Sequence, residues 1–97
     1  MLMIEATDQG ARVLEPIDWA NAVAMQSAGS VLLRQTEREE VWFDMAAVAA
    51  NSIALAVAVS WLGVAQEQRR ALRLTNLSDE FIGVIEFSGL ADLFRAT

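Results

Sequence analysis

The longest uncharged stretch of the chain runs from Met45 to Ala65, directly after the short apolar run Val41–Asp44. The β-branched and aromatic residues of that run predict a strand that ends in a carboxylate. Asn51 and Ser52 then supply side-chain oxygens of the kind that accept the free N–H groups of a first helical turn. We therefore predict a strand, an alanine-rich loop and a helix from Ile53 to Ala65.

The predicted helix has two unlike faces. One face carries small side chains at helical spacing: Ser52, Ala56, Ser60 and Gly63. The other carries bulky ones, with three more on its flank: Ile53, Val57, Trp61 and Val64, then Leu55, Val59 and Leu62. A helix that is apolar nearly all round must bury more than one side. We expect the bulky face to pack on the sheet and the small face to let another backbone approach, within the domain or on a partner.

Shorter patterns predict the other elements. Before the central segment they predict a strand Met1–Ala6, a turn Asp8–Gly10, a strand Arg12–Glu15, a helix Trp19–Gln35 capped by Asp18, and a charged loop Thr36–Glu40. After it they predict a strand Ala71–Thr75 and a helix that follows Ser78, with an apolar side of Phe81, Ile82, Ile85 and Phe87. A last apolar turn contains Leu90, Leu93 and Phe94. The order β-β-α-β-α-β-α predicts one α/β domain over residues 1–97. Its sheet would be mixed, with about four strands and right-handed crossovers.

Composition excludes several classes of function. The net charge is −6, and all seven cations are scattered arginines, so we expect no nucleic-acid partner. The chain has no Cys and no His, which excludes disulfides, thiol nucleophiles and imidazole bases and argues against a zinc site. It also has no lysine, so a Walker-type phosphate loop is absent. We predict a non-enzymatic protein without a metal or cofactor.

A membrane-spanning helix is the alternative interpretation of the uncharged stretch, which is about as long as a bilayer span. Asn51, Ser52 and Ser60 interrupt it, and a buried helix explains those residues better. The N-terminus shows no basic segment followed by a long apolar run, so no signal peptide is evident. We expect a cytoplasmic protein.

Two further groups of residues have alternative interpretations. Trp19, Trp42 and Trp61 could anchor a partner, since tryptophan is enriched in binding hot spots. Core packing is favoured for Trp42, and both roles stay open for Trp61. The acid pairs Glu39-Glu40 and Asp79-Glu80 could suggest acid–base chemistry, but no nucleophile accompanies them, so we favour solvated surface.

Four segments in this order resemble the STAS domain family: Phe43–Val48, Asn51–Leu55, Leu72–Leu77 and Ser88–Phe94. That family shows a strand ending in Asp, a hydroxyl-bearing pair opening an apolar helix, a strand ending near Asn, and a closing Gly-Leu-x-x-Leu turn. The short length and the ending are most similar to the MlaB-type branch. Those proteins are cytoplasmic subunits of the ABC system that moves phospholipid between bacterial membranes and maintains outer-membrane lipid asymmetry.

The resemblance implies docking on the ATPase subunit of such a complex, with the membrane reached only through that complex. The implied contact residues are Asn51, Ser52, Leu55, Ala56, Val59, Ser60 and Gly63. In the other well-known branch, the anti-sigma factor antagonists, the residue matching Ser52 is phosphorylated by an anti-sigma serine kinase. Asn51 departs from the Asp usual in that branch, which argues against the kinase switch. Two alternatives stay open: that Ser52 merely caps its helix, and that the apolar helix drives homodimers.

Overall fold

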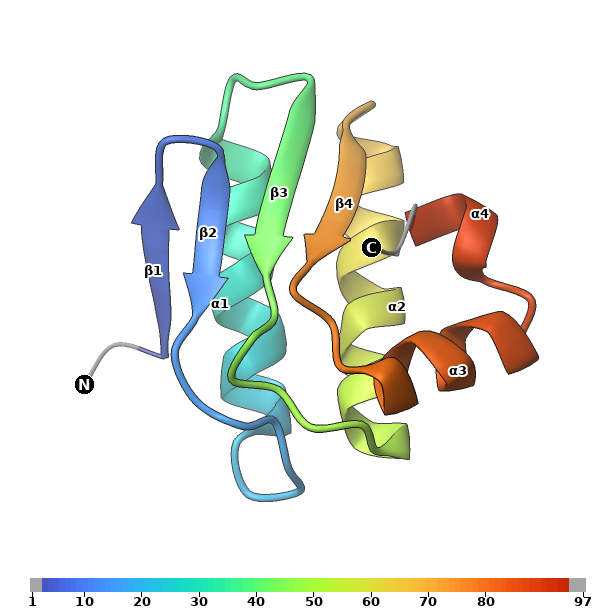
Figure 1. The fold of residues 1–97 in the computed structure, drawn as a ribbon. Coiled ribbons are helices and arrows are strands. Elements are labelled where there is room, and N and C mark those ends of the chain that lie inside the picture. The colour runs from blue at the N-terminus through green and yellow to red at the C-terminus, as the bar shows by residue number, and fades with distance from the viewer. Residues whose placement is uncertain (1–2, 95–97) are drawn as a thin grey trace.

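The fold is a four-stranded mixed sheet with helices packed on it, as the computed structural model describes it for residues 3–94 (Figure 1). The elements are β1 Ile4–Thr7, β2 Gly10–Val13, α1 Ala22–Gln35, β3 Glu40–Asp44, α2 Ser52–Glu67, β4 Ala71–Thr75, α3 Asp79–Phe87 and α4 Ala91–Phe94. The sheet order is β1-β2-β3-β4, antiparallel between β1 and β2 and parallel in the other two pairs. The predicted α/β fold and element order are confirmed.

The domain has two layers. Figure 1 shows α1 and α2 behind the sheet, α3 and α4 beside β4, and no helix over the face toward the viewer. Strand alternation sends one set of side chains toward the helices, among them Val41, Phe43, Leu72 and Leu74, and all four are buried. The core therefore lies between the sheet and the helical layer, and the opposite sheet face is open within residues 3–94.

Trp61 joins the two helices of the covering layer. Its side chain is fully buried, and its indole lies edge-on to Phe43, with ring centroids 5.0 Å apart. The indole also lies directly against the backbone of Gly29 on α1, where an added Cβ would be 2.2 Å from Nε1. Trp61 Nε1 donates a hydrogen bond to the Gln26 carbonyl oxygen at 3.1 Å. Gly29 therefore makes room for Trp61, at the expense of helix propensity.

Two predicted boundaries are wrong. The second strand begins at Gly10, because this residue pairs with Trp42 in the neighbouring strand. The first helix begins at Ala22 rather than Trp19. The Asp18 carboxylate does accept two backbone N–H groups, from Ala20 and Asn21, but it stabilises a turn that precedes the helix. Met1 and Leu2 of the predicted first strand lie outside the described residues.

Two aromatic residues were assigned to the wrong side. Phe87 is 95% exposed, since it follows the buried Ile85 by two positions and so lies on the opposite side of α3. Trp42 alternates with Val41 and Phe43, which both point into the core, so its side chain lies on the open sheet face. The helical period explains the error for Phe87, and the two-residue period of a strand explains the error for Trp42.

Helix α2 has 16 residues and ends at the charged Glu67. Within residues 3–94, no helix combines the length and the hydropathy that crossing a bilayer requires.

We expect Gly29→Ala to lower the free energy of unfolding by about 2 kcal/mol, because overpacking against the rigid indole outweighs the gain in helix propensity. Gly63→Ala is the matched control, since nothing lies within 4 Å of a Cβ at that helical position. The control should gain about 0.5–1 kcal/mol. Urea unfolding of the two variants measures both effects, and equal stabilities would contradict the Trp61–Gly29 packing.

Candidate protein-interaction site

The first turn of α2 is fixed by Asn51. Its backbone is extended, and its side-chain oxygen accepts a hydrogen bond from the Ala54 N–H at 2.7 Å, which makes it the N-cap of the helix. Its side-chain amide donates to the Ile17 carbonyl oxygen at 3.0 Å. The predicted cap is confirmed, and the same side chain ties the start of α2 to the loop between β2 and α1.

Ser52 lies one residue inside the helix, and its side chain is exposed. The interpretation that Ser52 merely caps its helix is wrong, because the oxygen that accepts the first-turn N–H group belongs to Asn51. The serine hydroxyl is thus presented to solvent at the positive end of the helix dipole.

The small face of α2 is largely open to solvent. Ser52, Ala56 and Gly63 are exposed, and Val59, which was assigned to the flank, is 40% exposed beside them. Leu55 is half-buried and packs against the core. Six of the seven proposed contact residues therefore share one helix face or its first turn, with Leu55 at the margin.

Ser60 lies on the small face but is half-buried and engaged within the domain. The side-chain amide of Gln26 donates to Ser60 Oγ at 3.0 Å and to Ser30 Oγ at 2.9 Å. Gln26 on α1 therefore links the two helices by binding Ser60, a residue of the small face of α2. The close backbone approach expected on that face occurs elsewhere within the domain, at Gly29 against Trp61.

The outer surface of both helices is free of charge over most of its length. No residue is charged from 19 to 33 or from 45 to 66, although the chain carries a net charge of −6. On α1, Val23 is 82% and Val31 48% exposed, and on the neighbouring α2 Val59 is 40% exposed. We call this surface the uncharged helical face and define it by its exposed members: Val23, Ser27, Val31, Ser52, Ala56, Val59 and Gly63. Exposed apolar surface of this kind marks interaction sites.

The three tryptophans have three different positions. Trp61 is buried in the core, so its role as a partner anchor is wrong. Trp42 is half-buried on the open sheet face, where Nε1 donates to Glu40 Oε1 at 2.9 Å and Arg73 lies 6.0 Å from the ring centroid. Trp19 is 86% exposed in the loop before α1. Of the three, Trp19 alone has an exposed ring.

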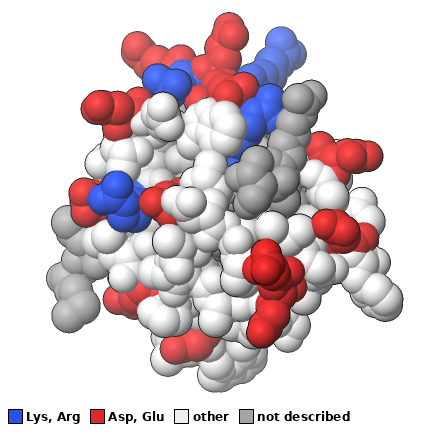
Figure 2. Space-filling view, in the orientation of Figure 1, with Lys and Arg blue, Asp and Glu red and all other residues white. Residues whose placement is uncertain are grey.

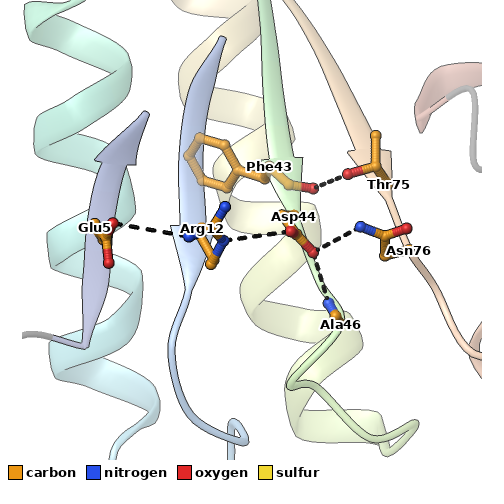
Figure 3. Close-up of polar contacts among 7 residues, drawn as sticks. All are labelled: Glu5, Arg12, Phe43, Asp44, Ala46, Thr75 and Asn76. Atoms are coloured by element: carbon orange, nitrogen blue, oxygen red, sulfur yellow. Dashed lines mark hydrogen bonds and ion pairs between the residues drawn. The ribbon is translucent and has the colours of Figure 1, made fainter. Parts of the chain in front are cut away.

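A polar network crosses the open sheet face (Figure 3). Arg12 lies between Glu5 and Asp44, with N–O distances of 3.8 and 3.5 Å. Asp44 also accepts hydrogen bonds from the Asn76 side chain and the Ala46 N–H, at 3.1 and 3.0 Å. Burial raises the pKa of Asp44, but these hydrogen bonds and the Arg12 charge outweigh it, so the pKa lies below the ordinary value of 3.8.

The network borders a shallow hollow of about 380 Å³ on the same face. Trp42 and two threonines line it, together with Arg12, Asp44 and Asn76, which already bind one another. Figure 2, which views this face, shows blue and red groups next to one another among uncharged atoms. The hollow therefore has the character of a solvated sheet surface.

The acid pairs lie on the surface of residues 3–94, as the sequence predicts. Glu39 is exposed, whereas Glu40 pairs with Arg73 at 3.1 Å. Asp79 and Glu80 are exposed in the first turn of α3, where carboxylates stabilise the helix dipole. No group of three or more potential metal ligands occurs within the part of the chain that the structure describes.

No protein-family model matches the chain, and no curated protein sequence matches it.

We expect Asn51→Ala to lower the free energy of unfolding by at least about 1 kcal/mol, since it removes the helix cap and leaves the Ile17 carbonyl without its donor. Ser52→Ala should stay within about 0.5 kcal/mol of wild type, because the hydroxyl does not cap the helix. Chemical unfolding of the two variants distinguishes the residues. A larger loss for Ser52→Ala would show that the cap is misassigned.

We expect the ion pair of Asp44 to contribute stability that depends on pH. The folded-state pKa is lowered, so the contribution is present well above 3.8 and is lost as the pH falls below that value. Asp44→Asn removes the titrating group. The difference in melting temperature between wild type and variant should therefore shrink between pH 6 and pH 3, as thermal scans can measure. A difference independent of pH would contradict this role.

Proposed function

We propose that this chain is a non-enzymatic interaction domain that docks on a larger protein through the uncharged helical face and the exposed Ser52. The observation that carries the proposal is the absence of charge over most of the length of two adjacent helices in an acidic chain, with charged residues only near their ends and Val23 82% exposed. Exposing the apolar side chain of valine to water costs free energy, and burial against a partner would offset that cost.

The proposed partner is the nucleotide-binding subunit of an ABC phospholipid-transport complex. The element order, the Asn51-Ser52 pair at the start of α2 and the closing Gly89-Leu90 segment support the resemblance to MlaB-type STAS domains. The proposed role is to support assembly or activity of the ATPase. The protein would be cytoplasmic and peripheral to the inner membrane through that partner.

An anti-sigma factor antagonist is the second candidate, and the exposed hydroxyl of Ser52 favours it. A phosphate there would gain from the helix dipole and would add a charge of about −2 beside an otherwise uncharged surface. Desolvating that charge would block a flush apolar contact. Asn51 in place of Asp is the residue that disfavours this candidate.

Affinity purification from the native cells tests the choice of partner. Recovery of an ABC ATPase together with its permease would support the lipid-transport role. Recovery of a serine kinase of the anti-sigma type would instead support the antagonist role and overturn the first.

We expect Ala56→Trp to abolish partner binding, because the new ring would stand in the middle of the uncharged helical face. Ser52→Glu should do the same, because it buries a carboxylate. Gly83→Trp is the matched control, since Gly83 is an exposed helical position on α3 with nothing within 4 Å of its Cβ. Binding is measured by titration calorimetry, and urea unfolding confirms that the variants fold. Normal binding by Ala56→Trp would exclude this surface.

A further inference from the structure

Trp19 lies in the loop between β2 and α1, four residues before Val23 of the uncharged helical face, and is 86% exposed. An exposed indole on a mobile loop would have little significance. This loop, however, is held by an unusual number of side-chain hydrogen bonds. The Asp18 carboxylate accepts from the N–H groups of Ala20 and Asn21, at 2.9 and 3.2 Å. In the opposite direction, the side-chain oxygen of Asn21 accepts a hydrogen bond from the Asp18 N–H at 2.9 Å.

Further hydrogen bonds hold the first residues of the same loop. The Asn21 side-chain amide donates to Glu15 Oε1 at 2.9 Å and to the Pro16 carbonyl oxygen at 2.8 Å. The adjacent Ile17 is fully buried, and its carbonyl oxygen accepts from the Asn51 amide. The loop therefore holds Trp19 in solvent at a set position relative to the start of α2. A loop backbone that is ordered before binding loses less conformational entropy on binding than a mobile loop does.

The charges around Trp19 indicate the chemistry of its partner. Because β2, β3 and β4 are parallel, the loops that follow them lie along one edge of the sheet, the lower edge in Figure 1. Asp18, Asp79 and Glu80 are exposed along that edge, and the nearby Arg12 is paired with Asp44. The other arginines of residues 3–94 lie in the last turn of α1, in the loops before β3 and β4, and in β4: Arg34, Arg38, Arg69, Arg70 and Arg73. In Figure 2, the bottom of the view carries red atoms without blue.

We propose that Trp19 is the anchor of the docking interface, and that it fills an apolar pocket of the partner protein that is bordered by lysine or arginine side chains. This inference rests on the proposed function, since it adds the loop before α1 to the uncharged helical face. A central buried tryptophan surrounded by weaker contacts is the usual arrangement of an interface hot spot. Cationic side chains on the partner would complement the acidic edge and raise the association rate.

The test uses the ABC ATPase subunit purified from the native cells and the domain labelled with 5-fluorotryptophan. The fluorine resonance of Trp19, assigned with Trp19→Phe, should move on titration with the ATPase, whereas that of the buried Trp61 should stay in place. Trp19→Ala should weaken binding by about 30-fold or more. Phe87→Ala is the matched control, because Phe87 is 95% exposed at the far end of α3, and it should bind like wild type.

Charge is tested separately with Glu80→Gln, which should slow association at low salt, and with Glu39→Gln at the opposite edge as control. An unmoved Trp19 resonance, or a Trp19→Ala affinity within threefold of wild type, would overturn the anchor while leaving docking through α2 intact. Equal association rates for Glu80→Gln and Glu39→Gln would overturn the cationic border. Failure of the ATPase to bind the wild-type domain would overturn the proposed function, and the anchor with it.

Discussion

The packing of Trp61 on Gly29 is the contact on which the arrangement of the domain depends. A buried indole is large, and it reaches both the sheet, through Phe43, and the backbone of α1. Its N–H group would be costly to bury without an acceptor, and the Gln26 carbonyl supplies one. One side chain therefore sets the spacing of the two helices and their distance from the sheet. The flat outer surface that they share follows from that spacing.

The open sheet face and the uncharged helical face differ in their content of charged side chains. On the open sheet face, charged side chains are frequent and neutralise one another, as Arg12 does with Asp44 and Arg73 with Glu40. Such exposed pairs add little stability, but they keep the sheet surface hydrated. On the helical side, charge is missing and valines are exposed. A domain that only had to stay folded in water would have no need for this difference, which supports a partner on the helical side.

Local signals made much of this structure predictable. Strand and helix periods gave the element order, and the preference of Asn for the N-cap identified the start of α2. Features that depend on long-range contacts were missed. The glycine at position 29 in the middle of α1 is explained only by the position of Trp61, which local sequence does not reveal. Trp19 was placed inside a helix, since Asp18 caps a turn as readily as a helix and the sequence does not separate the two. Gln26 reaches Ser60 across 34 positions, a distance that no local pattern covers.

The two hydrogen bonds of Asn51 give this position a chemical restriction that the helix cap alone would not impose. The cap needs only an acceptor, so aspartate would serve it equally well. The bond to the Ile17 carbonyl needs a donor, which aspartate lacks at neutral pH. Spontaneous deamidation of Asn51 would thus leave α2 capped, yet set a carboxylate against a carbonyl oxygen and repel the Trp19 loop from the helix. Deamidation of this single side chain would therefore weaken the attachment of the Trp19 loop without unfolding the domain.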